Sequence, residues 1–398
     1  MSPGRLRTIP DLGDLAGRRV LVRCDFNVPL EEGRITDDFR ITATVPTLVE
    51  LLGGGANLVL CSHLGRPKGQ VVERYRLDPV ANRLADALGR EVTKLDRVVG
   101  PEVEAAVRQL PPGSVVLLEN LRFEPGEEAN DPAFADSLAL LAQAYVDDAF
   151  GAAHRAHGSV VGVAERLPSA AGLLMQKEIE ALSSLVEGAR RPFVAILGGA
   201  KVSDKLDAIK ALVDRVDALL IGGAMAFTFL AAAGGTVGRS LVEPDRFDEV
   251  REAATGAQEK GVLVQLPEDV VAAPEPTLDA RRETVRADAI PAGLMGLDVG
   301  PRTVEEFAQV IAEAGTIFWN GPMGMFELEP FSAGTRGVAY AVAGSNAFSV
   351  VGGGDSLAAL RKFDLLDRVD HVSTGGGASL EFLEGRELPG VAVLMEEA

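Results

Sequence analysis

The sequence predicts an α/β protein with two doubly wound, parallel-sheet (Rossmann-like) domains, joined by a linker helix and separated by an interdomain cleft. Three observations predict this fold. Short apolar runs alternate with helical patterns, as parallel strands alternate with their crossover helices. Most of these runs end in polar residues or glycines, where ligands of such sheets bind. The chain has 398 residues, more than a single hydrophobic core usually supports, so two domains are expected.

The composition limits the class of partner. Lys and Arg total 39 against 58 Asp and Glu, a net charge of −19, which argues against nucleic acid and anionic membranes as partners. Any phosphate site must therefore be a local basic island. Cys24 and Cys61, the only cysteines, lie in apolar strand-like runs. They predict buried thiols without a disulfide framework, as is typical of a reducing cytoplasm.

Two segments bear on localisation. The first residues lead into no apolar stretch of the secretory type, so we expect a cytoplasmic protein. Residues 218–238 carry no charge and are long enough to span a bilayer. Because this segment contains two glycine pairs, and its flanks, Asp217 and Arg239, give no basic bias, we interpret it as a buried strand (218–221), a glycine turn, and a buried helix beginning near Met225.

In the first half of the chain, four predicted strands (19–24, 57–61, 114–118 and 144–146) are separated by helical patterns such as 77–88 and 132–141. Polar or basic residues follow these strands: Asp25, Asn27, Arg40, His63, Arg66, Arg122, Arg155 and His157. The carboxyl ends of parallel strands share one edge of a sheet, so these side chains should converge on one crevice. Singly, each could be a core histidine or a rim ion pair. Together they favour an anion pocket, since the arginine fork suits carboxylate and phosphate.

The pattern changes near residue 172. Met175, Ile179, Leu182 and Val186 repeat at helical spacing and lead into a polar stretch at 187–192. This pattern predicts a helix that links the two domains.

The second half opens with an apolar strand at 193–197, followed by Gly198 and Gly199. We predict a helix from Ala200 onward, with Lys201 and Lys205 on one face of its first turn. Cations there oppose the helix dipole unless an anion is bound. The alternative is that both lysines are solvated surface residues.

Further strand–glycine–helix units follow at 219–227, 348–356 and 371–379. Several helix N-termini directed at one face would make a polyphosphate-binding surface. Asp355 follows three glycines, where it could be a helix N-cap or a carboxylate for Mg²⁺. In the segment 317–327, Trp319 and Phe326 should pack in the core, whereas Asn320 and Glu327 are polar groups without a helical register.

These features together indicate phosphoryl transfer between two domains. Apart from Asp25, the first pocket offers no carboxylate or histidine clearly placed as a general base. A hydroxyl acceptor would need one. A carboxylate acceptor would not, because a carboxyl group is already ionised at neutral pH.

Segments in both halves resemble the signature segments of phosphoglycerate kinase, in family order: 24–29, 62–67, 119–123, 148–157, 197–205, 319–324, 352–355 and 373–379. The resemblance covers nearly the whole chain. It implies reversible phosphoryl transfer from 1,3-bisphosphoglycerate to ADP, giving 3-phosphoglycerate and ATP, in glycolysis and gluconeogenesis. It also implies Mg²⁺ bound with the nucleotide, and a monomer whose partners are these small molecules.

The resemblance assigns roles to single residues. It implies that the phosphoglycerate is held by Asp25, Asn27, Arg40, His63, Arg66, Arg122 and Arg155. It implies that the nucleotide is held by Gly199, Lys201, Gly223, Asn320, Glu327, Gly353, Gly354, Asp355 and Ser356, with Glu327 on the ribose and Asp355 on the metal. The catalytic set would be Arg40, Lys201, Lys205 and Gly376. The implied domains are 1–171 for phosphoglycerate, with a returning tail at 383–398, a helix at 172–187, and 188–382 for the nucleotide.

Three positions depart from the family pattern: Cys24 replaces a common valine, Ala224 a common third glycine, and Leu294 a frequent tryptophan. Ala224 could narrow the approach of the nucleotide to its turn. A second hypothesis is a two-lobed nucleotide- and anion-binding sensor without catalysis, which the presence of Arg40, Lys205 and Asp355 disfavours. A dinucleotide dehydrogenase is also disfavoured, because the G-x-G-x-x-G turn followed by an acidic residue is missing.

Overall fold

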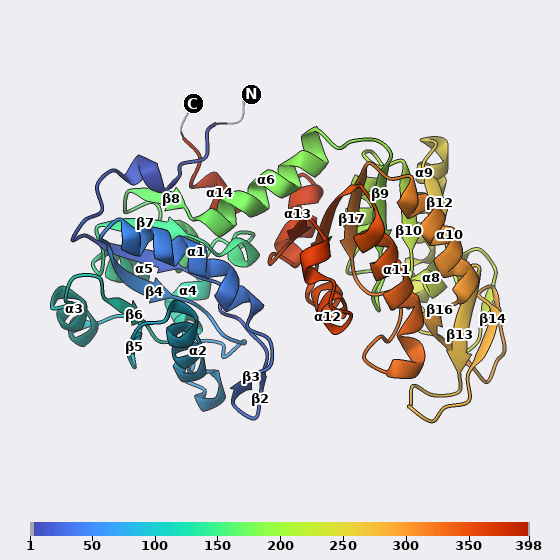
Figure 1. The fold of residues 1–398 in the computed structure, drawn as a ribbon, viewed down its shortest axis with the longest axis horizontal. Coiled ribbons are helices and arrows are strands. Elements are labelled where there is room, and N and C mark those ends of the chain that lie inside the picture. Colours follow the sequence, from blue (N-terminus) through green and yellow to red (C-terminus); the bar gives the residue numbers. More distant parts are fainter. Residues whose placement is uncertain (1–3, 397–398) are drawn as a thin grey trace. The chain divides into compact units, whose positions relative to one another are not determined.

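The computed structural model describes residues 4–396, and the chain divides into two compact units (Figure 1). The first unit contains Met1–Glu180 and Glu387–Ala398, and the second contains Ala181–Arg386. The boundary falls within helix α6 (Leu173–Glu187), so one helix carries the chain from one unit to the other. Leu383 ends helix α13 (Gly377–Leu383) of the second unit, and the chain rejoins the first unit at Glu387.

The first unit is built on one six-stranded parallel sheet (Figure 1). Its spatial order is β5 (Thr93–Lys94), β6 (Val115–Leu117), β4 (Asn57–Cys61), β1 (Arg19–Arg23), β7 (Ala144–Asp147) and β8 (Ser169–Ala171). From β1 the chain goes first to β4 on one side and later to β7 on the other. The strand order therefore reverses around β1, and ligands bind at such a switch point, beyond the carboxyl ends of the strands.

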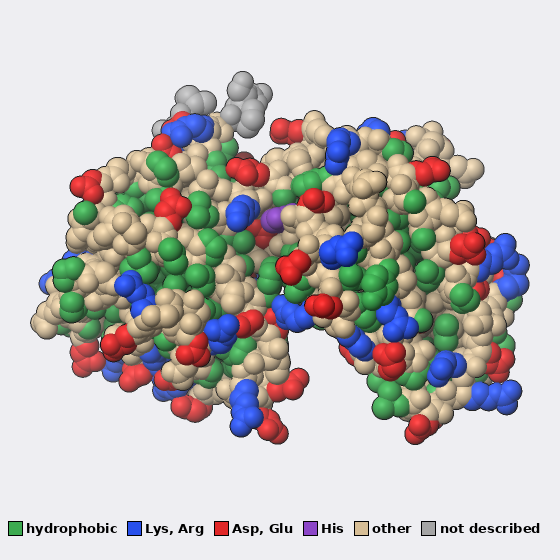
Figure 2. All heavy atoms as spheres, viewed as in Figure 1, with side chains coloured by type: hydrophobic (Ala, Val, Ile, Leu, Met, Phe, Trp, Pro, Cys, Tyr) green, Lys and Arg blue, Asp and Glu red, His purple; other side chains and the backbone are tan. Residues whose placement is uncertain are grey.

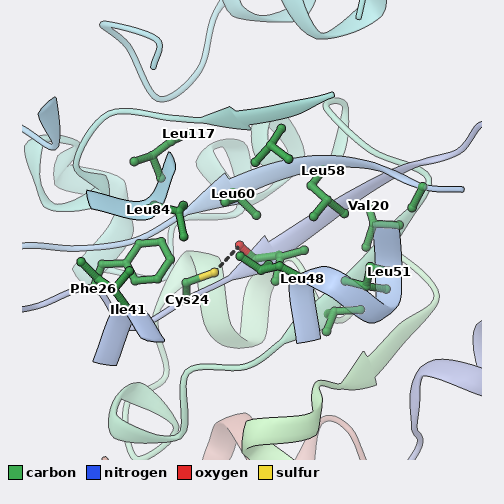
Figure 3. Packing of buried hydrophobic residues seen from close by; sticks show 14 of the residues in the cluster. Val20, Cys24, Phe26, Ile41, Leu48, Leu51, Leu58, Leu60, Leu84 and Leu117 are labelled. Carbon is green, nitrogen blue, oxygen red and sulfur yellow. Dashed lines mark hydrogen bonds between the residues drawn. The ribbon is translucent and has the colours of Figure 1, made fainter. Parts of the chain in front are cut away.

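Both faces of this sheet are covered, which explains why its strands read as continuous apolar runs. Val20 and Val22 of β1 belong to one buried cluster with residues of α1 (Phe39–Gly53) and α2 (Asp78–Leu88). Figure 3 shows Val20 with Leu48 and Leu51 of α1 in this cluster. Leu21 faces the opposite cluster, with residues of α3 (Pro101–Arg108) and α5 (Pro132–Ala139). Cys24 and Cys61 are both buried, free thiols, as predicted.

The second unit contains another six-stranded parallel sheet, with the order β12 (Leu263–Gln265), β10 (Ala218–Ile221), β9 (Phe193–Leu197), β17 (Thr316–Asn320), β18 (Phe348–Gly352) and β19 (His371–Val372). Here the order reverses between β9 and β17. The longer helices of the unit are α9 (Phe247–Glu259), α10 (Pro301–Ala312), α11 (Ala333–Gly344) and α12 (Gly354–Lys362). Apolar residues of β9 and β17 pack with Phe307 of α10 and Val338 of α11. The prediction of two parallel α/β domains is confirmed.

The structure adds strands that we did not predict. In the second unit, β14 (Glu283–Arg286), β13 (Asp269–Ala273) and β16 (Met295–Val299) form an antiparallel sheet, and β11 (Thr236–Val237) pairs with β15 (Ala289–Ile290). In the first unit, β2 (Leu30–Glu31) and β3 (Arg34–Ile35) form a short hairpin. Strands β14, β11 and β2 are short or exposed, so they lack the apolar runs that marked the parallel strands. Strands β13 and β16 are largely buried five-residue strands that the sequence analysis did not identify.

The uncharged segment 218–238 forms strand β10 and helix α8 (Ala226–Ala232), with Met225 as the N-cap, as predicted. Across residues 4–396, no helix is both long and apolar enough to cross a membrane. On the face shown in Figure 2, Lys and Arg side chains are interspersed with Asp and Glu side chains over both units.

Candidate active site

The ends of strands β1 and β4 bring three of the predicted residues into one cluster. Arg40, near the start of α1, places Nη1 3.1 Å from Oδ2 of the buried Asp25. Asp25 Oδ1 accepts a hydrogen bond from the Asn27 backbone N–H at 3.2 Å, and Arg40 Nη1 donates to the Asn27 carbonyl at 3.2 Å. The Ser62 hydroxyl ties the two strand ends together by accepting from the Phe26 N–H at 2.8 Å. The geometry therefore fixes Asp25, Asn27 and Arg40 relative to one another.

A glycine connects this cluster to Arg122. The Gly65 N–H donates to Asn27 Oδ1 at 2.9 Å, and the Gly65 carbonyl accepts from Arg122 Nη1 at 2.6 Å. Gly65 has a φ of +63°, and a Cβ there would lie 2.3 Å from the ring of Tyr75. Only glycine fits this position, because a side chain would be strained and would also clash.

His63 is buried at the centre of a group of arginines. Burial lowers its pKa well below 6.5, and the charges of Arg23, Arg122, Arg155 and Arg40 lower it further. Burial, together with the charge of Arg155, also lowers the pKa of Arg122 to about 10. Four guanidinium groups act on one neutral imidazole, and Arg40 and Arg122 also pair with Asp25 and Glu128. This concentration of guanidinium donors suits an anionic ligand.

Arg66 and Arg155 are the remaining predicted residues of this unit. Arg66 is exposed, and Arg155 Nε donates to His154 Nε2 at 3.0 Å. The sequence analysis missed Arg23, which is 1% exposed. Its Nη2 lies 3.1 Å from His63 Nδ1. A charged residue within an apolar run is the signal that could have identified it, because buried charges require partners.

In the second unit, three turns meet backbone to backbone. The Gly198 N–H donates to the Asn320 carbonyl and the Gly199 N–H to the Pro322 carbonyl, both at 3.0 Å. Gly223 has a φ of +64°, and a Cβ on it would lie 2.4 Å from the Gly199 nitrogen. The turns after β9, β10 and β17 can therefore pack this closely only with glycine at 223.

Lys205 lies against these turns. Its Nζ donates to the Asn320 carbonyl at 2.8 Å and also to Asn320 Oδ1. Burial lowers the pKa of Lys205 to about 8, against the opposing charges of Asp355 and Asp204. The Lys205 ammonium group therefore lies beside the glycine turns and loses its proton at a lower pH than an ordinary lysine.

The prediction that Lys201 and Lys205 share one helical face is wrong. Helix α7 (Leu206–Leu212) begins after Lys205, and Lys201 is an exposed loop residue. Glu243 holds this segment as a turn, because its carboxylate accepts from the Ser203 N–H at 3.0 Å and from the Ser203 hydroxyl at 2.6 Å. The pKa of Glu243 is lowered, despite burial, by hydrogen bonds from Ser203 and Val202 and by the charge of Lys201. Lys201 therefore lies toward Glu243, whereas Lys205 lies toward Asn320.

Helix α12 supplies the third glycine-rich element. Gly353 is its N-cap with a φ of +91°, and Gly354 and Asp355 lie in the first turn, both exposed. Ser356 is buried, and its hydroxyl accepts from the Gly321 N–H at 2.6 Å, which joins α12 to the turn after β17.

Two predicted residues lie away from this junction. Glu327 is exposed on a loop whose Phe326 carbonyl accepts from Lys362 Nζ at 2.6 Å. Gly376 is the N-cap of α13 with a φ of +52°.

Asp355 is the carboxylate of this unit that the sequence analysis associated with a metal ion. Within the part of the chain that the structure describes, no group of three or more His, Cys, Asp or Glu side chains could hold a metal ion. Mg²⁺ commonly binds through one or two carboxylates together with substrate phosphates. One exposed carboxylate in the first turn of a glycine-capped helix, close enough to act on Lys205, fits that kind of binding.

Comparison with known proteins identifies the family. The phosphoglycerate kinase family model matches residues 9–386. The phosphoglycerate kinase of Rubrobacter xylanophilus is 59% identical over 390 residues, covering 98% of each chain. That of Thermomicrobium roseum is 56% identical over 393 residues, covering 99% of this chain and 100% of the relative.

Solved structures agree with this family. The phosphoglycerate kinase of Coxiella burnetii matches with a TM-score of 0.86 and 42% identity, covering 98% of this chain and 99% of the other. The enzyme of Pyrococcus horikoshii matches with a TM-score of 0.88 and 33% identity, covering 98% of both. The chain therefore belongs to the phosphoglycerate kinase family, and it is an enzyme that transfers a phosphoryl group reversibly between 1,3-bisphosphoglycerate and ADP.

Proposed function

We propose that the two units divide the substrates of this reaction, the first binding the phosphoglycerate and the second the nucleotide. The observation that carries the assignment is the group of four arginines in the first unit that act on the neutral His63, with Arg23, Arg40 and Arg122 held by hydrogen bonds and an ion pair. The phosphate and carboxyl groups of 3-phosphoglycerate would be held there by Asp25, Asn27, Arg40, His63, Arg66, Arg122 and Arg155.

The nucleotide would lie on the glycine turns of the second unit. The N–H groups of Gly199 and Gly223 already donate to the Pro322 and Met323 carbonyls, so these glycines would contribute a backbone surface without side chains that the phosphate groups can approach closely. The proposed contacts are Gly199, Lys201, Gly223, Asn320, Glu327, Gly353, Gly354, Asp355 and Ser356. Glu327, exposed on its loop, would accept from the ribose hydroxyls.

The chemistry requires positioning and charge rather than a base. The acceptor carboxylate is already ionised at neutral pH, so no side chain has to remove a proton. Arg40 and Lys205 would stabilise the charge that develops on the phosphoryl oxygens, with Lys201 and Gly376 completing the catalytic set. Asp25 holds the Arg40 guanidinium at 3.1 Å, and Asn320 holds the Lys205 ammonium at 2.8 Å. Both cations are therefore oriented before substrates arrive.

Mg²⁺ is the proposed cofactor, with Asp355 as its protein ligand. When bound, it would neutralise charge on the nucleotide phosphates and so assist transfer. We further propose a cytoplasmic monomer without nucleic-acid or membrane partners. The free thiols of Cys24 and Cys61 and the net charge of −19 support this proposal.

Calorimetry on two variants tests the two-site assignment. Arg122→Ala should weaken the binding of 3-phosphoglycerate by roughly 1.5–3 kcal/mol, the range for a hydrogen bond to a charged group, and leave Mg-ADP binding unchanged. Asp355→Asn should weaken Mg-ADP binding and leave 3-phosphoglycerate binding unchanged. If either variant weakened both ligands equally, the division of the site would be wrong.

A further inference from the structure

We propose that Glu127 is a positioning residue for the phosphoglycerate pocket, because through Ser159 it fixes Arg23, which in turn fixes the ring tautomer of His63. The inference rests on the proposed function only in taking His63 as a substrate contact. None of the residues of this relay except His63 was predicted as a site residue.

The relay is a continuous chain of buried hydrogen bonds. Glu127, in the short helix α4 (Pro125–Glu128), accepts from the Ser159 hydroxyl at 2.6 Å and from the Ser159 N–H at 2.8 Å. The Ser159 hydroxyl in turn accepts from Arg23 Nε at 2.9 Å. Glu127 and Ser159 are 0% exposed and Arg23 is 1% exposed, so water does not compete with these bonds.

The direction of each bond follows from chemistry. A guanidinium has only donors, so Ser159 Oγ must accept from Arg23 and donate its proton to Glu127. For the same reason, His63 Nδ1 must accept from Arg23 Nη2, which lies 3.1 Å away. Asp25 Oδ1 is 4.0 Å from Nδ1, beyond hydrogen-bond distance, and does not compete. The ring proton of His63 is therefore fixed on Nε2, which leaves Nε2 as a donor for an anionic substrate.

Glu127 is also the main counter-charge of Arg23. Burial opposes the guanidinium charge, but the charges of Glu127, then Asp147 and Asp25, keep the pKa of Arg23 raised. The pKa of Glu127 stays low despite burial, through His157, whose Nδ1 lies 3.7 Å from Glu127 Oε1, the charge of Arg23 and the hydrogen bond from the Ser159 hydroxyl. Burial raises the pKa of Asp147 to about 6, and its charge acts on Arg23 less strongly than that of Glu127. Without Glu127, the guanidinium would lack its strongest partner and would reorient or leave His63.

The test uses the full-length enzyme and the ring nitrogens of its four histidines, observed by ¹⁵N–¹H correlation NMR. In the unaltered protein, His63 should show a single neutral tautomer with the proton on Nε2. Glu127→Gln should replace it with a mixture of tautomers and raise KM for 3-phosphoglycerate roughly tenfold, the effect of one weakened hydrogen bond. KM for the nucleotide should not change.

Two further variants keep the test decisive. Ser159→Ala removes the bridging hydroxyl but keeps the backbone bond to Glu127, and it should give the same change at His63 if Glu127→Gln does not fold. Glu128→Gln is the matched control: Glu128 lies 3.2 Å from Arg122 Nε and has no part in the relay, so His63 should keep its tautomer.

The outcomes separate the relay from the proposed function. If His63→Ala raises KM for 3-phosphoglycerate while Glu127→Gln and Ser159→Ala leave both the tautomer and KM unchanged, the relay is overturned and the pocket stands. If His63→Ala itself leaves KM unchanged, the assignment of His63 to the substrate fails.

Discussion

Replacing Asp148 with asparagine should make the stability of the first unit less sensitive to pH. Asp148 follows strand β7, and its Oδ1 accepts from the Leu174 N–H at 2.9 Å and the Met175 N–H at 3.3 Å, at the start of α6. Oδ2 is buried and has no hydrogen-bond partner among the described residues. Asparagine can keep Oδ1 as the acceptor and place its amide nitrogen where Oδ2 lies, so the change removes the charge and little else.

The sign and size follow from the pKa. Burial raises the pKa of Asp148 from 3.8 to about 7, against the hydrogen bonds that its carboxylate accepts from Met175 and Leu174. A carboxyl group whose pKa is raised in the folded state stabilises the fold fully below the unfolded value and loses that contribution as pH rises through about 7. The whole loss is about 4 kcal/mol, since one pKa unit corresponds to 1.36 kcal/mol. Between pH 5 and pH 8 the linkage relation gives a loss of about 2–3 kcal/mol.

The chain offers a separate probe for each unit. Cys24 and Cys61, its only cysteines, are buried in the first unit, so thiol labelling reports unfolding there. Trp319, the only tryptophan, is buried in β17 of the second unit, so its fluorescence reports unfolding of that unit. Urea unfolding followed by thiol labelling gives the midpoint of Asp148→Asn and that of the unaltered protein at pH 5 and at pH 8. The midpoint of the variant minus that of the unaltered protein should be about 1–2 M larger at pH 8 than at pH 5.

The Trp319 transition is the internal control and should change little. If the variant and the unaltered protein differed by the same amount at both pH values, the charge on Asp148 would not be the cause. If the shift appeared only in the fluorescence, the effect would lie in the wrong unit.

Three other changes can be measured with the same material. Asp298→Asn should shift the Trp319 transition instead, because burial raises the pKa of Asp298 to about 7. The gain in stability at pH 8 should be smaller than for Asp148→Asn. The two oxygens of Asp298 accept from the Val299 and Gly334 N–H groups, and an amide can accept at only one of these positions. Lys205→Ala should lower kcat and kcat/KM together by roughly 10²-fold with KM nearly unchanged, and an unchanged kcat would contradict the role of Lys205. In the unaltered enzyme, kcat/KM should fall above about pH 8, where Lys205 loses its proton. Glu119→Gln should destabilise the first unit by about 1–3 kcal/mol in thiol labelling, because Arg76 and Lys94, now 3.0 and 2.7 Å from the carboxylate, lose their buried partner. The loss should stay in this range because Arg76 keeps Glu73 and Lys94 keeps Asp78 and Asp96; no measurable loss would contradict it.

The sequence predicted the parts of the site that follow from strand order. Asp25, Asn27 and His63 could be grouped because parallel strands end at a shared edge, and Arg40, shortly after the first strand, could be added to them. The contacts of Asp25 with Arg40 and of Asn27 with Gly65 lie at this edge. Gly199 and Gly223 could be paired for the same reason, since both follow neighbouring strands of the second sheet.

What the sequence could not predict depends on contacts between distant residues. Lys201 was misplaced because Glu243, 40 residues away from Ser203, holds the loop outside the helix. The role of Arg23 was invisible because its partner Ser159 lies 136 residues along the chain. Sequence periodicity indicates which face of a helix or strand is buried, but it does not indicate which polar group from a distant part of the chain contacts that face.

The position of the final segment has a consequence for how the protein is made. Residues from Glu387 onward belong to the first unit, where the Arg7 N–H donates to the Leu394 carbonyl at 3.0 Å and the Glu396 N–H to the Arg5 carbonyl at 2.9 Å. On the ribosome, the whole second unit is therefore synthesised before the first unit can be completed. Until then the first unit, although synthesised first, lacks its last segment, and the surface around Ala153 stays uncovered. In the complete protein the Gly390 N–H donates to the Ala153 carbonyl at 2.8 Å. Chaperones that act on the nascent chain would meet that surface.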